Sequence, residues 1–134
     1  MADKEVIIAG KRMMYGTSIK ASPETNNSTT TTFDGNIVQG TKNVSYSIDI
    51  GRVRYDNQTT HRELSEKVED MLENADIITV REIVRPSGEE PYVIVDNFFD
   101  CITDGSDYDI KPDDHTVENL KFKASRRERK YEGL

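Results

Sequence analysis

The sequence predicts an α+β domain that is mainly β, with an antiparallel sheet or barrel and one amphipathic helix. Three patterns support this fold class. Apolar and polar residues alternate strictly through residues 44–50, which is typical of a half-buried strand. An apolar stripe with helical spacing runs through residues 64–75. Beyond it, two apolar strand patterns flank a loop that contains Pro86 and Gly88.

Length, composition and charge limit the kind of protein this is. At 134 residues the chain is expected to form a single domain with one hydrophobic core. The 25 acidic residues outnumber the 18 lysines and arginines, which gives a formal net charge of -7. This balance argues against a conventional phosphate-binding surface, because such a surface needs clustered cations.

The compartment is suggested by three absences in the sequence. The single cysteine, Cys101, excludes an intrachain disulfide and any multi-cysteine metal site. No apolar run approaches the roughly 18 residues of a membrane span. Residues 1–10 lack the long apolar core of a signal peptide. We therefore expect a soluble protein that is made in the cytoplasm.

The N-terminal part is predicted to hold a short strand, a polar loop and a hairpin. Residues 6–9 are a short apolar run, and residues 17–32 are rich in Ser, Thr and Asn, which favours a surface loop. The threonines at its end could add a strand that pairs only with a partner. A tight turn is predicted at residues 33–36, because Asp-Gly tolerates a positive φ. Residues 29–54 are thus expected to form a hairpin or meander.

The strand predicted at residues 44–50 has two chemically different faces. Its apolar face comprises Val44, Tyr46, Ile48 and Ile50. Its polar face carries no lysine or arginine and comprises Ser45, Ser47 and Asp49. Because successive side chains of a strand point to opposite sides, we expect one face to pack on the core and the other to meet water.

One helix is predicted from a capping box and an apolar stripe. Thr60 and Glu63 have the spacing in which the threonine hydroxyl accepts from the N3 amide and the glutamate reaches back to the cap amide. The stripe comprises Leu64, Val68, Met71, Leu72 and Ala75. We predict that the first four of these residues pack on the core, that the acidic opposite face is solvated, and that the helix ends at residues 74–76.

The C-terminal part is predicted to return to β structure. Residues 77–85 and 91–95 suit two antiparallel strands, and residues 96–102 extend the second strand directly or after a bulge. A turn is predicted at residues 104–107, and alternation predicts a closing strand at residues 120–124. Residues 126–134 form a basic tail that we expect to be frayed or docked on a partner.

Residues that could support metal binding or catalysis are scattered. An acidic stretch between residues 104 and 115 could bind calcium through carboxylate oxygens. Its spacing matches no EF-hand loop and no zinc motif is present, so we interpret the stretch as an acidic loop kept soluble by its charge. His61 is expected at the surface. Cys101 lies among apolar strand residues, which favours a buried and inert thiol.

Nucleophilic and phosphate-binding motifs are also missing from the sequence. No serine lies in a Gly-x-Ser-x-Gly elbow, and the glycines form no phosphate loop. We therefore predict that the chain is not an enzyme, that it has no catalytic residues, and that it uses no cofactor or metal.

The order of these features resembles the tail tube proteins of tailed bacteriophages, especially contractile-tailed ones. The resemblance rests on pattern and size over most of the chain. It includes the short N-terminal strand, the Thr-rich entry into residues 31–35, the two-faced strand at residues 44–50, the amphipathic helix, a β-hairpin and the closing strand at residues 118–124.

This resemblance implies a small barrel or sandwich of two antiparallel sheets with a flanking helix. Six copies would form a ring around a lumen, and rings would stack into a tube that conducts DNA. The tubes of type VI secretion systems and R-type bacteriocins share this architecture. On this sequence, the resemblance implies that Ser45, Ser47 and Asp49 face the lumen. A polar, neutral to acidic wall would let a polyanion pass without being held.

The resemblance also implies a location and partners. The chain would be one tail-tube-like domain over residues 1–134, with a polar arm at about residues 10–32 and the basic tail. It would be made in the host cytoplasm and reside in the virion tail, without membrane insertion. Its partners would be other copies in stacked hexameric rings, the tail sheath, the tape measure, and baseplate or terminator proteins. DNA would pass through the lumen without specific binding.

Two alternatives stay open at this point. The first is another baseplate, neck or tail-terminator component. The second is a monomeric ligand- or calcium-binding β-domain.

Overall fold

The computed structural model describes residues 4–26, 29–31, 37–39, 43–55, 60–105 and 107–133. These residues form eleven strands and one helix. In chain order they are β1 (Lys4–Ile8), β2 (Lys11–Gly16), β3 (Ile19–Asn26), β4 (Thr29–Thr31), β5 (Ile37–Gln39), β6 (Asn43–Tyr55), α1 (His61–Asp70), β7 (Asp76–Val84), β8 (Tyr92–Thr103), β9 (Asp109–Lys111), β10 (Thr116–Ala124) and β11 (Arg126–Gly133).

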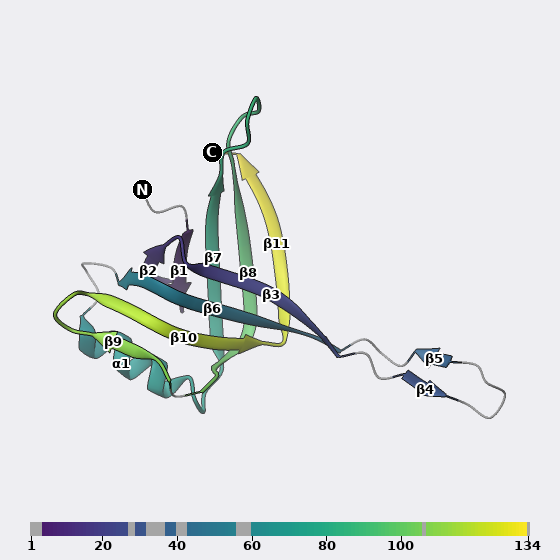
Figure 1. The fold of residues 1–134 in the computed structure, drawn as a ribbon, viewed down its shortest axis with the longest axis horizontal. Coiled ribbons are helices and arrows are strands. Elements are labelled where there is room, and N and C mark those ends of the chain that lie inside the picture. The colour runs from purple at the N-terminus through teal and green to yellow at the C-terminus, as the bar shows by residue number, and fades with distance from the viewer. Residues whose placement is uncertain are drawn as a thin grey trace.

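Six of these strands close an antiparallel barrel in the order β1-β2-β6-β10-β8-β7. The ring closes where β8 meets β10, with Thr103 opposite Phe122 and Ile102 opposite Lys123. Outside the ring, β3 pairs with β6, β9 with β10 and β11 with β8. In Figure 1, β3, β6 and β10 run across the picture, whereas β7, β8 and β11 run up it. The predicted fold class is therefore confirmed as a mainly β, antiparallel barrel with one short helix.

The centre of the core lies between β6, β10 and the strands that face them. Ile48 and Ile50 of β6 are at most 1% exposed, and they lie opposite the fully buried Phe122 and Leu120 of β10. Tyr46 packs against the same core at its edge. Full burial of such side chains contributes about 1.5–3 kcal/mol each. The predicted two-faced strand is confirmed within β6.

β6 and β10 change the face that they turn to the core at one shared point. Gly51 and Asn119 are both exposed and lie at matching positions in the β6–β10 register. Ile50 is buried before this point and Val53 is buried after it, so the alternation slips by one residue. Asn119 has a φ of 58°, a left-handed conformation that asparagine adopts more readily than most residues. After the slip, Arg52 and Arg54 of β6 lie on the outer surface.

Helix α1 packs its buried residues on the barrel core and is shorter than predicted. The Thr60 hydroxyl accepts from the Glu63 amide at 3.1 Å, so the predicted N-cap is present. The Glu63 carboxylate pairs with Lys11. The helix ends at Asp70, with Met71 as its C-cap, about one turn before the predicted end.

The early end of α1 corrects one predicted core residue. Leu64, Val68 and Met71 are fully buried, whereas Leu72 is 40% exposed. Thr103 fixes the last turn on β8, because its hydroxyl donates to the Val68 carbonyl at 2.8 Å and its amide donates to the Met71 carbonyl at 2.9 Å. The chain turns away after Met71, so the helical spacing no longer applies and the prediction for Leu72 is wrong.

The predicted polar loop at residues 17–32 is wrong for most of its length. β3 pairs with β6 in an unbroken register from Ile19–Ile50 to Asn26–Asn43. Ile19 is buried, and Ala21 packs against the core. Only two apolar residues of β3 face inward among many polar ones, which is a weak period-two pattern, and pairing with the long strand β6 stabilises the strand.

β4 and β5 form a separate two-stranded sheet through pairs from Thr29–Gln39 to Thr31–Ile37. Figure 1 shows this pair held away from the barrel, beyond the ends of β3 and β6. The turn predicted at residues 33–36 and the side chain of Val44 lie outside the described residues. We call the β4–β5 pair the arm; most of residues 10–32, where the resemblance implies a polar arm, instead form β2 and β3 of the large sheet.

The C-terminal segment is a strand, so the basic tail is not frayed; its docking on a partner stays a prediction. β11 pairs with β8 from Arg126–Phe99 to Gly133–Tyr92. The Arg129 guanidinium donates to both oxygens of the buried Asp96 carboxylate, at 2.7 and 2.9 Å. This bidentate pair holds β11 against β8 and, together with the other contacts of the guanidinium, raises the pKa of Arg129.

Candidate functional site

The outer face of the β3–β6–β10 sheet holds the residues that the resemblance to tail tube proteins assigns to a lumen. Ser45, Ser47 and Asp49 are half-buried. They alternate along β6 with Ile48 and Ile50, whose side chains lie in the core. The strand therefore holds three polar side chains at fixed spacing on the side away from the core.

Lysines flank these polar side chains. Asp49 lies between Lys20 of β3 and Lys121 of β10, and Ser47 lies opposite Lys123 of β10. Directly opposed residues of an antiparallel pair share a face, with Cβ atoms about 4.5–5.5 Å apart. All three lysines are exposed. The expectation of a neutral to acidic face holds for residues 45–49 of β6 and does not extend to the neighbouring strands, because the sequence of one strand does not reveal its neighbours.

We call this surface the mixed-charge face, and it comprises Lys20, Ser22, Ser45, Ser47, Asp49, Lys121 and Lys123. Its charges partly compensate one another, since Asp49 lies between two lysines and the Lys123 ammonium is 3.8 Å from the Asp104 carboxylate. Exposed pairs of this kind contribute only about 0–1 kcal/mol and weaken with salt. The face can contact a polyanion transiently, and nothing in its chemistry selects a sequence or a base.

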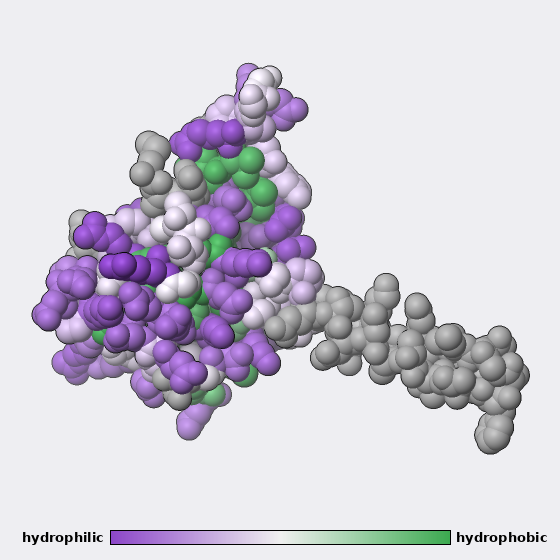
Figure 2. Space-filling view, viewed as in Figure 1, coloured by the Kyte–Doolittle hydropathy of each residue, from purple (hydrophilic) through white to green (hydrophobic). Residues whose placement is uncertain are grey.

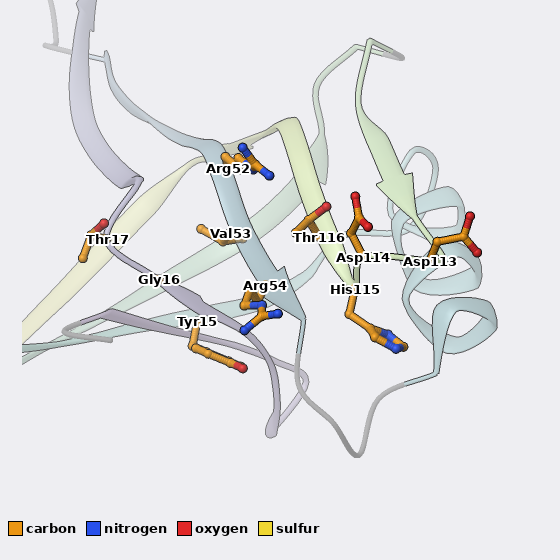
Figure 3. A pocket seen from close by; sticks show the side chains of 10 residues that line it. All are labelled: Tyr15, Gly16, Thr17, Arg52, Val53, Arg54, Asp113, Asp114, His115 and Thr116. Carbon is orange, nitrogen blue, oxygen red and sulfur yellow. The ribbon is translucent and has the colours of Figure 1, made fainter. Parts of the chain in front are cut away.

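A pocket of about 840 Å³ lies at the end of β6, beyond the point where the strand changes face. Figure 3 shows that its walls come from the end of β2, from β6 and from the turn that joins β9 to β10. The lining residues are Tyr15, Gly16, Thr17, Arg52, Val53, Arg54, Asp113, Asp114, His115 and Thr116. Gly16 has to be small here, because a Cβ would lie 2.9 Å from the Val53 side chain.

The pocket carries opposite charges on its two sides. Arg52 and Arg54 come from β6, and two aspartates come from the β9–β10 turn. In the turn, His115 has a φ of 53°, and its ring lies edge-on to Tyr55, with 5.1 Å between ring centroids. The Thr116 hydroxyl is buried and has no hydrogen-bond partner among the described residues. This arrangement suits a polar or zwitterionic guest.

Tyr55 lies directly beneath the turn and helps to hold it. Its hydroxyl is 3.1 Å from the Lys111 carbonyl, to which it donates, and its amide donates to the His115 carbonyl at 3.0 Å. Burial, followed by the nearby Asp113 carboxylate, raises the pKa of Tyr55. The phenol therefore stays neutral and acts as a structural donor.

The residues considered for catalysis or metal binding do not converge. Cys101 is fully buried, its thiol lies 3.3 Å from the Phe98 carbonyl, and burial raises its pKa to about 12, so the predicted inert thiol is confirmed. His61 lies at the surface but is half-buried, with Nε2 3.0 Å from the Ile110 carbonyl.

The acidic stretch is spread out by the fold. Asp104 faces Lys123, Asp109 lies opposite Glu118 at the edge of β9, and the last two aspartates line the pocket. Within the described ranges, no group of three or more His, Cys, Asp or Glu side chains could hold a metal ion. The described part of the chain also has no helix long and apolar enough to cross a membrane.

No family model matches the chain, and no curated protein matches it at a significant level.

Sequence reasoning missed both the lysines of the mixed-charge face and the pocket. The lysines lie on strands far apart in sequence, so only the register joins them to Asp49. The pocket depends on the slip at Gly51 and on the turn before β10, neither of which leaves a pattern in composition.

Proposed function

We propose that this chain is a structural subunit of a bacteriophage tail tube, in which hexameric rings stack into a conduit for genome delivery. The proposal joins the order of features in the sequence to a mainly β barrel with one flanking helix. The observation that carries it is the arm. β4 and β5 pair with each other and with no other strand among the described residues.

An isolated pair of this kind needs cover from another molecule. Two-stranded hairpins are marginally stable in water unless they pack on a third strand or on a helix. Because the arm extends away from its own barrel in Figure 1, a neighbouring subunit is the natural source of that packing. Arms that reach from one copy to the next also suit a repeating assembly, where the same contact recurs around each ring.

The β3 edge adds a second assembly element. Among the described strands, β3 pairs only with β6, so its other edge is open. Pro23 lies within β3, and proline is found on edge strands because it lacks a donor for a further strand. A neighbouring copy could therefore pair with residues 20–22 of this edge but not through the whole strand, since Pro23 lacks a donor and the Ile19 carbonyl already accepts from the Lys4 ammonium at 2.7 Å. This restriction would make the contact selective.

The mixed-charge face is the surface that we assign to the lumen. Ser45, Ser47 and Asp49 lie along its middle strand, and the carboxylates of Asp49 and Asp104 offset two of its three lysines. The small net charge that is left limits the potential that the wall presents to a passing polyanion, and salt screens it further. DNA would thus slide along the wall without a specific site. The tail sheath, the tape measure and baseplate or terminator proteins would contact other surfaces of the tube.

Assembly of the purified protein tests the proposal. Light scattering and negative-stain microscopy should detect rings or tubes at high concentration or after seeding with a tail-initiating complex. A matched variant in which residues 29–39 are replaced by a short Gly-Ser linker should keep the barrel fold and lose assembly. A wild-type chain that stays monomeric at every concentration and with every seed would contradict the proposal.

The pocket favours one second candidate, a monomeric ligand-binding β-domain. A small polar guest would suit this pocket. The pocket has room for it, two arginines line one side, and the buried Thr116 hydroxyl has no hydrogen-bond partner among the described residues. This function requires a stable monomer, whereas the tube requires assembly. The same scattering experiment therefore separates the two.

A further inference from the structure

The second open sheet edge belongs to β11. This strand pairs with β8 along its whole length and with no other described strand. Arg129 is tied to the buried Asp96, and the Arg127 guanidinium lies 5.0 Å from the ring centroid of Tyr46, a residue at the edge of the core. Residues 127, 129 and 131 of β11 therefore face the inner side of the sheet. The alternate residues face its outer side.

The outer side of β11 carries charges of alternating sign. In chain order they are Arg126, Glu128, Lys130 and Glu132, all of them exposed. Charged edges usually prevent pairing because like charges repel a second strand. A series of alternating sign behaves differently. When the same strand of a second copy runs antiparallel to it, each positive residue of one strand can lie opposite a negative residue of the other.

The complementarity is complete in one two-fold register. In this register β11 pairs antiparallel with β11 of a second copy, and the two copies of Arg129 lie opposite each other. A residue a given number of positions before Arg129 then faces the residue the same number of positions after Arg129 in the second copy. Arg126 then opposes Glu132 of the second copy, and Glu128 opposes Lys130 of the second copy. By symmetry, all four outer pairs join opposite charges. Opposite charges directly across an antiparallel pair are favourable, and like charges are unfavourable.

Neighbouring registers are excluded by the same residues. A shift that centres the pairing on residue 128 places Arg126 opposite Lys130 and Glu128 opposite itself. A shift that centres it on residue 130 places Glu128 opposite Glu132 and Lys130 opposite itself. A slip by one residue turns the outer side of one strand against the inner side of the other. Only the register centred on Arg129 brings the whole series together without repulsion on the outer face.

The inner side of β11 is compatible with this register. Arg127 would oppose Tyr131 of the second copy, a ring that is 65% exposed in the single chain and can take a guanidinium over its face. The two Arg129 side chains would face each other at the centre. Each is already balanced by two hydrogen bonds to its own Asp96 carboxylate, which limits their repulsion.

We infer that β11 is a docking edge for a second copy of this chain, which pairs antiparallel with it in the register centred on Arg129. The contact joins β7, β8 and β11 of both copies into one continuous sheet. It is a two-fold contact, distinct from the head-to-tail contacts of a ring, and it stands whether or not the tube proposal does.

A charge-swap series tests this contact in the full-length protein. K130E places a glutamate opposite Glu128 of the second copy at two symmetric positions, and E128K places two lysines together in the same way. Each should raise the dimer dissociation constant by about tenfold or more, because two attractive pairs become repulsive. The double variant E128K/K130E restores opposite charges and should return the constant to within about threefold of the wild type. E89K, in the exposed β7–β8 loop, is the matched control.

Sedimentation equilibrium at low salt gives the constants, and circular dichroism checks that every variant is folded. Disulfide trapping gives the register. A mixture of E128C and K130C chains should cross-link quickly, whereas E128C alone should not, and the buried Cys101 should not compete. A wild-type protein that shows no dimer, single reversals without effect, a double reversal that fails to restore dimerisation, or faster cross-linking of E128C with itself would each overturn the inference.

Discussion

The two faces of β6 have different roles, and their residues alternate along the strand. The inner face holds Ile48 and Ile50 in the core, where neither is more than 1% exposed. The outer face holds Ser47 and Asp49 beside lysines from two other strands. The inner face sets stability through burial, whereas the outer face is free to vary its charge with little effect on folding.

The largest difference between the faces should appear at adjacent positions of β10. Phe122→Ala should cost about 3–5 kcal/mol, because it removes a fully buried ring and leaves a cavity. Lys121→Ala, one residue earlier on the outer face, should change the free energy of unfolding by no more than about 0.5 kcal/mol. Urea denaturation of both variants measures the two values. Equal losses would show that the faces are not separated as described.

A second pair of variants compares two leucines that the sequence places on one stripe. Leu64→Ala should lower the free energy of unfolding by about 2–5 kcal/mol, because Leu64 is fully buried on the core side of α1. Leu72→Ala should cost less than about 1 kcal/mol, because the side chain is 40% exposed beyond the end of the helix. Thermal and urea unfolding check both. A large loss for Leu72→Ala would place the end of α1 later than the structure does.

The β8–β11 pair should show an intermediate effect. Arg129→Ala leaves the carboxylate of Asp96, which is 6% exposed, without its charged partner, at a cost of about 1–3 kcal/mol. Lys130→Ala, the neighbour on the outer side, should have little effect on the unfolding of the single chain. Both are measured by urea denaturation below the dimerisation range. Equal, small effects would mean that β11 is not held through Asp96.

The sequence predicts those parts of the fold that depend on local patterns. The two-faced strand, the Thr60 cap and the β7–β8 hairpin all have strong period-two, capping or turn patterns, and each is present. β3 was missed because Ile19 and Ala21 are its only clear inward apolar residues, and β11 because its charges obscured its alternation. Both strands are stabilised by a long partner, and strand pairing over such distances cannot be derived from local composition.

The candidate site was predicted in part for the same reason. Ser45, Ser47 and Asp49 share one face because alternation within a strand is local. The lysines beside them come from β3 and β10, and the pocket depends on a conformation at Asn119 and His115 that their residue types permit but do not require. The site therefore needed the register between strands, which the sequence alone does not provide.

The smallest effect on stability should come with the largest effect on the proposed function. Ser47→Arg with Asp49→Lys leaves Ile48 and Ile50 in place, so unfolding should change by about 1 kcal/mol or less. The change removes the carboxylate between Lys20 and Lys121 and adds cations in every subunit, so the wall should hold phosphates. Genome delivery by particles carrying the variant should fall, with partial relief by salt. Ser47→Thr with Asp49→Asn is the control, and normal delivery by the charged variant would remove this face from the lumen.

The central claim is that β6 presents its outer face to a channel, and imaging of the seeded assembly by electron cryo-microscopy tests it most directly. The account predicts stacked six-fold rings in which Ser45, Ser47 and Asp49 face the axis and the arm of each subunit contacts a neighbour. Rings in which this face points away from the axis, or a protein that forms no ring under any seeding condition, would contradict the claim.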